Sequence, residues 1–126
     1  MTAFVIFLGT GLGGLARYAV GMRIQEAMGA GFPWGTLFVN LSGSLLLTFL
    51  YGALEGTMAS SEWRAFLGIG FCGGYTTFST FGYETVRLLQ DGEWERAALY
   101  VLGSVLLSLA GAVLGFRAAS VLLQRG

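Results

Sequence analysis

GFCGGYTTFSTF, residues 70–81, places three glycines, four serine or threonine hydroxyls and three phenylalanines in the middle of an apolar segment. Glycine weakens helical continuity, and hydroxyl side chains can satisfy the backbone groups that a break releases. Irregular backbone at membrane depth is tolerated only where protein or a water-filled cavity covers it. A close-packing seam is the commoner reason for Gly and Thr in a membrane helix, but the interleaved Phe residues argue against it. The stretch therefore predicts a membrane helix that is broken near its middle and built around a site.

The composition of the whole chain predicts an all-α membrane protein. Of its 126 residues, 55% are hydrophobic and 11% are charged, with a mean hydropathy of +0.70, which is too apolar for an ordinary soluble domain. Four apolar windows reach the roughly 20 residues that a membrane-spanning helix needs. These windows cover residues 3–22, 34–54, 63–89 and 97–123. We interpret the first as a span rather than a signal peptide, because no basic residue precedes it and it lacks a persuasive cleavage site. The expected architecture is a single four-helix transmembrane domain over residues 1–126.

The types of residue that are missing or scarce exclude several functions. The chain has no histidine, and Cys72 is its single cysteine, so an intrachain disulfide is impossible. Transition-metal sites normally use His or Cys ligands, and nucleophilic catalysis commonly uses His, so we expect no enzyme. All seven basic residues are arginines, they balance seven acids, and they form no basic run that would bind nucleic acid.

The arginines are nearly evenly divided between the two sides of the membrane. With four spans, one side carries Arg64, Arg117 and Arg125, and the other carries Arg23, Arg87 and Arg96, with Arg17 a little deeper. Since cytoplasmic loops should be richer in basic residues, a near tie predicts insertion in both orientations and hence an antiparallel pair of identical chains. A single topology set by other features is the alternative.

Polar residues recur every four positions in two of the spans, which places each set along one helix face. The second span carries Thr36, Asn40, Ser44 and Thr48, and the fourth carries Tyr100, Ser104 and Ser108. One such residue could be a structural hydrogen bond between helices, but a row favours the lining of a pathway. Neither row contains a carboxylate, so a proton or cation relay along them is not expected.

Two pairs of glycines at the same spacing predict close helix packing instead. Gly9 and Gly13 lie in the first span, and Gly111 and Gly115 lie in the fourth. A small-xxx-small pair lets the backbone of another helix approach closely.

The aromatic residues after the expected break suit a small anion. Phe78 and Phe81 are three residues apart and share a face if helix resumes there, with Thr77, Thr80 and Glu84 on the adjacent face. The edge of an aromatic ring is positive, so two Phe edges beside hydroxyls can solvate an anion. Simple packing of both rings is the plainer alternative.

Two charged residues are expected near a vestibule. Arg17 would cost about 2.5–3.5 kcal/mol at the bilayer centre, so it should face protein, water or headgroups, where it either snorkels or attracts anions. Glu84 lies roughly 13 Å along the helix axis from a break near Tyr75, close to the edge of the apolar core. It either pairs with Arg87 or takes part in gating or relay.

These residues together resemble the Fluc/CrcB family of fluoride channels. The motifs that carry the resemblance are GGLARY at residues 13–18, GTLFVNLSG at residues 35–43 and GFCGGYTTFSTF at residues 70–81. The resemblance implies an antiparallel, dual-topology homodimer in a bacterial inner membrane, with two pores that export fluoride passively.

The resemblance also implies which residues do this. Phe78 and Phe81 correspond to the phenylalanines that line the pores, and Asn40, Tyr100 and Ser104 match polar positions on the same pathway. With the neighbouring hydroxyls, the expected pore and fluoride-binding residues are Thr36, Asn40, Thr77, Phe78, Ser79, Thr80, Phe81, Tyr100 and Ser104. The break in the third helix would hold a structural sodium ion at the dimer centre through the backbone carbonyls of Gly73 and Thr76.

Two other functions share this size and topology. A dual-topology, proton-coupled exporter of lipophilic cations needs an acid at membrane depth, and Glu84 is the candidate. A helical packing partner of a larger complex is the other, although the polar rows and the Phe pair are surplus to that role.

Overall fold

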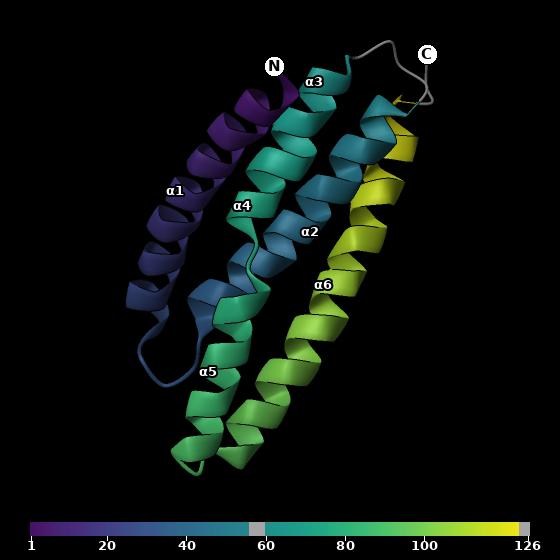
Figure 1. Cartoon of the computed structure of the whole chain (residues 1–126). Helices are drawn as coiled ribbons and strands as arrows, with labels where there is room; N and C mark the ends of the chain where they lie inside the picture. Colours follow the sequence, from purple (N-terminus) through teal and green to yellow (C-terminus); the bar gives the residue numbers. More distant parts are fainter. Residues whose placement is uncertain (56–59, 124–126) are drawn as a thin grey trace.

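The computed structural model describes residues 1–55 and 60–123, and these residues form helices and no strand. Three helices are long and apolar enough to cross a membrane: α1 (Thr2–Met28), α2 (Trp34–Leu54) and α6 (Trp94–Leu123). They run side by side with the third expected helix, which is divided into shorter pieces (Figure 1). Helix therefore occupies all four apolar ranges, and the all-α prediction is confirmed.

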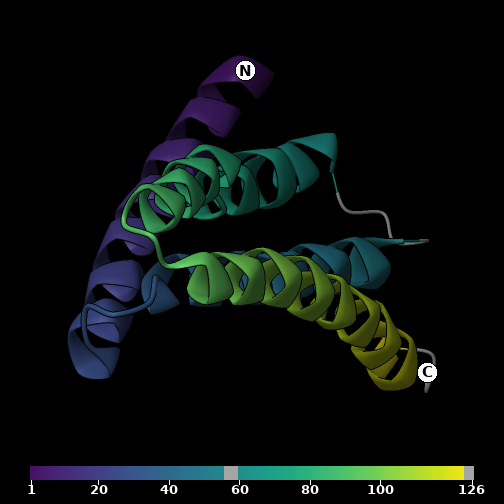
Figure 2. The same ribbon diagram turned by 90° about the horizontal axis from the view of Figure 1, so that it is seen from below.

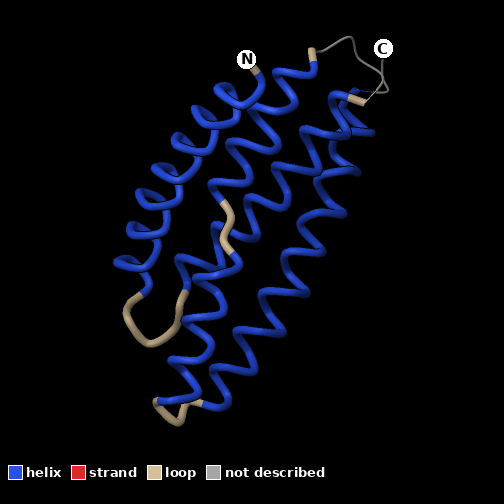
Figure 3. The backbone as a smooth tube through the Cα atoms, viewed as in Figure 1, coloured by secondary structure: helices blue, strands red, loops and turns tan. Residues whose placement is uncertain are grey.

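The third helix is broken, as the sequence predicts. Its first half consists of α3 (Ser61–Arg64), the π-helix η1 (Ala65–Cys72) and α4 (Gly73–Tyr75), which follow one another without interruption. Its second half is α5 (Phe78–Gln90). Figure 3 shows the two halves joined by a short loop in the middle of the molecule.

The glycines are not where the helix breaks, which corrects the expectation that Gly70, Gly73 and Gly74 interrupt it. All three lie within continuous helix, and the break falls at Thr76 and Thr77, whose backbones are extended. Gly70 and Gly74 instead permit close packing, because an added Cβ would meet the backbone of α1. Consecutive β-branched residues favour extended backbone, and Thr is a good N-cap, so the two threonines end one helix and begin the next.

The helices pack as two pairs. Figure 2 shows α1 with the divided third helix on one side and α2 with α6 on the other. Gly9 and Gly13 are buried where α1 meets η1, and an added Cβ at either would meet the backbone of Phe66 or Phe71. Gly111 and Gly115 pack in the same way against α2. Both predicted glycine seams are therefore confirmed.

The interior of one chain is small. Tyr100, Val39 and Cys72 are the largest side chains that are fully buried among the described residues, whereas many large apolar side chains are exposed on all four spans. In water these exposed faces would be unfavourable, but lipid tails are as apolar as the side chains themselves. The surface is that of a protein embedded in a bilayer.

Candidate functional site: a groove at the helix break

The break is stabilised by side chains from α1 and α2. Asn40 Nδ2 donates to the carbonyl of Thr77 (3.0 Å), and the N–H of Thr77 donates to Asn40 Oδ1 (2.7 Å). Arg17 Nη1 donates to the carbonyl of Thr76 (3.2 Å), and the Thr76 hydroxyl donates to the carbonyl of Cys72 (3.0 Å). Because unpaired backbone groups are costly at membrane depth, these contacts allow the chain to leave the helix there.

The second half of the helix begins with a capped N-terminus. The hydroxyl of Thr77 accepts from the N–H of Thr80 (3.2 Å) and also bonds the hydroxyls of Thr80 (3.1 Å) and Ser79 (3.3 Å). Thr77, Ser79 and Thr80, three of the predicted site residues, therefore form one cluster at the start of α5. A helix N-terminus carries partial positive charge and exposes N–H groups that suit an anion.

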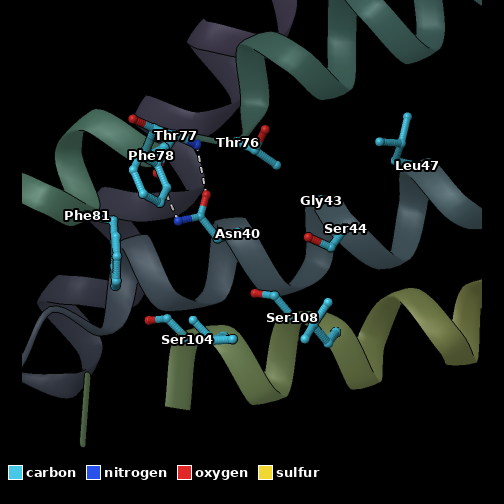
Figure 4. Close-up of a pocket in the computed structure, with 12 residues that line it drawn as sticks. Asn40, Gly43, Ser44, Leu47, Thr76, Thr77, Phe78, Phe81, Ser104 and Ser108 are labelled. Atoms are coloured by element: carbon cyan, nitrogen blue, oxygen red, sulfur yellow. Dashed lines mark hydrogen bonds between the residues drawn. The ribbon is translucent and has the colours of Figure 1, made fainter. Parts of the chain in front are cut away.

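A groove of about 360 Å³ opens beside this cluster (Figure 4). Its walls come from α2, from the break with the start of α5, and from α6. The lining residues are Asn40, Gly43, Ser44, Leu47, Thr76, Thr77, Phe78, Phe81, Ser104, Val105, Ser108 and Leu109. No charged side chain is among them. Asn40 and Ser44 of the α2 row and Ser104 and Ser108 of the α6 row thus face a common space, whereas Thr36, Thr48 and Tyr100 do not line it. Ser44 and Ser108 belong to the groove although the resemblance did not single them out.

Phe78 and Phe81 share a face, as predicted. Their ring centroids are 5.6 Å apart at an interplanar angle of 43°. Phe81 also contacts Tyr100 on α6, with centroids 5.1 Å apart. Phe78 is 84% exposed, so packing within one chain does not explain it.

Two hydroxyls of α6 are buried without a hydrogen-bond partner among the described residues. They belong to Tyr100, which is 0% exposed, and to Ser104, one helical turn further along. Leaving a buried hydroxyl unpaired costs roughly 1–3 kcal/mol. Both groups can donate to an acceptor that enters between the helices.

Glu84 and Thr36 form a separate contact outside the groove. The Thr36 hydroxyl donates to Glu84 Oε1, and a cavity of about 300 Å³ on the α1 side is lined by both residues together with Arg17 and Thr80. The alternative that Glu84 pairs with Arg87 is not realised: the ion pair found in the described part of the chain joins Arg96 and Glu93 (3.7 Å). A hydroxyl 48 positions away in sequence is the partner instead.

Gly73 and Thr76, the residues expected to hold sodium, lie before and after Tyr75, the last residue in the first half of the third helix. The backbone of Thr76 is extended (φ −85°, ψ 157°), so the Thr76 carbonyl does not point along the helix axis as helical carbonyls do. This carbonyl accepts a hydrogen bond from Arg17. Gly73 is exposed, with no atom within 4 Å of an added Cβ. A carbonyl oxygen has two lone pairs, so the donation from Arg17 leaves one for another ligand of Thr76.

Sequence reasoning missed two aromatic residues close to the site. Tyr75 is buried under α2, where its hydroxyl bonds that of Ser42 (3.0 Å), and Phe32 lies in the loop between α1 and α2 with its ring against Tyr100. Neither stands in a polar row, so no periodicity marks them.

Comparisons with known proteins agree with this geometry. A family model described as "CrcB-like protein, Camphor Resistance (CrcB)" matches residues 4–116. A Thermus thermophilus protein named "Fluoride-specific ion channel FluC" is 51% identical over 114 residues, which are 90% of each chain. Proteins of the same name from Coxiella burnetii and Paramagnetospirillum magneticum are 50% and 42% identical, covering 91% and 97% of this chain and 94% and 98% of their own.

Proposed function

This chain belongs to the family of CrcB-like proteins, and we propose that it is a fluoride channel that lets the ion leave the cell passively through a membrane. The relatives are named as ion channels, not enzymes, and three helices of the described chain can span a bilayer. The localisation we propose is the bacterial inner membrane.

The observation that carries this proposal is the pair of buried, unpartnered hydroxyls on Tyr100 and Ser104. Fluoride is a small anion that only accepts hydrogen bonds, and it must exchange strongly held water for donors within the protein. Ser104 lines the groove, and Tyr100, one turn away on α6, packs against the groove residue Phe81 without lining the groove itself. These hydroxyls can donate hydrogen bonds to fluoride within the membrane, where lipid tails have no donors.

The electrostatics of the groove also support an anion. The α5 N-terminus begins at Phe78, at the edge of the groove, and the Arg17 guanidinium lies at the break. No carboxylate lines the groove. The competing function, a proton-coupled exporter of lipophilic cations, would depend on Glu84, which lies outside the groove and accepts from Thr36.

The proposed channel is a homodimer of antiparallel chains. The groove of one chain is open on one side, and Phe78 projects beside it with 84% of its surface exposed. A second copy would cover Phe78 and supply the missing wall. The balanced arginines support an antiparallel arrangement, in which two identical grooves give two pores.

A structural sodium ion at the dimer centre is a further part of the proposal. The carbonyls of Gly73 and Thr76 are suitable ligands, since backbone oxygens can replace the hydration shell of a small cation. When bound, sodium would neutralise carbonyls that two chains bring together. Arg17 already donates to the Thr76 oxygen, so the ion would share that atom with a guanidinium.

Efflux from liposomes tests the channel. Purified protein in vesicles loaded with potassium fluoride should release fluoride only after a potassium ionophore supplies a counter-ion path, and vesicles loaded with potassium chloride should release far less anion. Efflux that needs a proton gradient and carries no current would favour the exporter.

A further inference from the structure

Gln25 fastens the loop between α1 and α2. Its Nε2 donates to the carbonyls of Gly29 (2.5 Å) and Phe32 (2.9 Å), and its Oε1 accepts from the N–H of Gly35 (3.2 Å). One side chain near the end of α1 thus bonds both the loop and the first turn of α2. Gly29 has φ +94°, a conformation that L side chains rarely adopt, so the loop turns at a glycine.

The first turn of α6 also contacts this loop. Arg96 Nη1, from the first turn of α6, donates to the carbonyl of Gly31 (3.1 Å). The loop therefore joins α1, α2 and α6 on the side of the molecule where α5 ends, as the views in Figures 1 and 3 show. It lines a cavity of about 400 Å³ that also includes Glu84.

The fastened loop places the ring of Phe32 against Tyr100. Their centroids are 5.5 Å apart at 85°, an edge-to-face contact. The Tyr100 ring also contacts Phe81, with centroids 5.1 Å apart. The buried Tyr100 ring thus packs against both the loop and the proposed pore aromatic, and the direction of the ring sets where its hydroxyl can donate.

We propose that Phe32 and Gln25 are positioning residues for fluoride conduction, with Phe32 holding Tyr100 directly and Gln25 holding Phe32. The inference rests on the proposed function, because it assigns these residues to the orientation of a proposed fluoride donor. Neither residue lines the groove. A donor must be held in place by packed neighbours to offset the lost hydration of an anion, and the rings of Phe32 and Phe81 are such neighbours of Tyr100.

A double-mutant cycle tests the inference in the full-length protein reconstituted in liposomes. Phe32→Ala should lower the fluoride efflux rate about two- to tenfold, the range that corresponds to one lost aromatic pair. Tyr100→Phe removes the hydroxyl and should also lower efflux. If Phe32 acts by orienting that hydroxyl, then adding Phe32→Ala to Tyr100→Phe should cause little further loss.

Conservative variants separate positioning from folding. Phe32→Tyr keeps the ring and should retain most efflux, whereas Gln25→Glu keeps an acceptor for Gly35 but loses both donors and should lower efflux as Phe32→Ala does. Phe49→Ala removes another half-buried ring, far along α2 from Tyr100, and should leave efflux unchanged.

The outcomes distinguish failure of the positioning role from failure of the proposed function. Additive losses in the double variant, or an equal loss in Phe49→Ala, would overturn the positioning role while wild-type efflux continued. If wild-type protein itself released no fluoride, the proposed function would fail first. Should Phe32→Ala not fold, the cycle is run with Gln25→Glu and Tyr100→Phe.

Discussion

Asn40 and Thr77 exchange two hydrogen bonds across the break in the third helix, each serving once as donor and once as acceptor. The reciprocal pair fixes the orientation of the Asn40 amide, because only one placement of its oxygen and nitrogen satisfies both backbone groups. It leaves one amide N–H and one lone pair of Asn40, a residue that lines the groove, outside these two bonds. The same contact thus satisfies the backbone at the break and leaves a donor on a residue beside the proposed ion path.

Replacing Asn40 with Asp should damage both stability and conduction. The carboxylate has the same shape but cannot donate to the Thr77 carbonyl, and it adds negative charge to the groove. We expect a loss of about 1–3 kcal/mol in the free energy of unfolding and at least a tenfold loss of fluoride efflux. Thermal melting in detergent and liposome efflux measure the two effects.

Ser120→Ala is the matched control for Asn40→Asp. It removes a hydroxyl that, among the described residues, bonds the Phe116 carbonyl of its own helix (3.1 Å), far from the break. Its melting and efflux should match those of the wild type. An Asn40→Asp protein with normal efflux would show that the amide has a structural role alone.

The two phenylalanines should respond differently to the same substitution. Phe78→Ile removes a ring edge from a side chain that is 84% exposed, so it should lower conduction steeply without destabilising one chain. Phe81→Ile also loses the contact with Tyr100, so it should lower both conduction and melting temperature. Met at either position, being polarizable and flexible, should preserve part of the flux.

Phe7→Ile is the control for these variants, because Phe7 is 71% exposed on α1 and lines no part of the groove. Efflux and dimer content should be unchanged in it. Normal fluoride efflux through both Phe78→Ile and Phe81→Ile, each folded and dimeric, would make the rings packing residues.

The sequence predicts the helices and the general location of the break because both depend on local features. Hydropathy marks each apolar range, and the run of threonines marks where helix can stop and start again. The residues that contact the break from other helices cannot be predicted from such local features. Whether Gly74 breaks a helix or packs against Thr10 depends on a segment more than 60 residues away.

The partner of Glu84 could not be predicted from local sequence either. Spacing along one helix suggests that Glu84 meets Arg87, yet its partner is Thr36 on α2. Phe32 could not be found either, because a single aromatic residue in a loop has no periodicity, and its contact with Tyr100 exists only once α6 returns to the start of α2.

The orientation of the chain should be controllable by charge. Replacing Glu55 and Glu62 with Lys adds basic residues at the end of α2 and in the first turn of α3, on either side of residues 56–59, which lie outside the described structure. The positive-inside rule predicts that this variant inserts with that connection in the cytoplasm. If two opposite orientations form the channel, efflux should disappear.

Coexpression with a variant biased the other way should then restore efflux. Chemical labelling of a single engineered cysteine in Cys72→Ala protein reports the orientation of each variant. Full activity of the Lys variant alone, in one orientation, would contradict the antiparallel dimer.

Adjacent glycines in the third helix should separate folding of one chain from association of two. An added Cβ at Gly74 would meet the Thr10 backbone of α1, so Gly74→Ala should destabilise the chain by about 1–3 kcal/mol, as overpacking does. At Gly73 nothing lies within 4 Å, and Ala is about 1 kcal/mol better than Gly in a helix interior. Gly73→Ala should therefore leave the single chain at least as stable.

The same Gly73→Ala change should weaken the dimer if this exposed turn meets its copy around a sodium ion. The added methyl group would keep the two backbones apart and move the Gly73 and Thr76 carbonyls away from a shared cation. We expect a larger monomer fraction by single-molecule photobleaching in bilayers and a lower fluoride efflux, with unchanged secondary structure. A Gly73→Ala protein that stays dimeric and conducts normally would place Gly73 against lipid, and the proposed sodium site would then have to be abandoned.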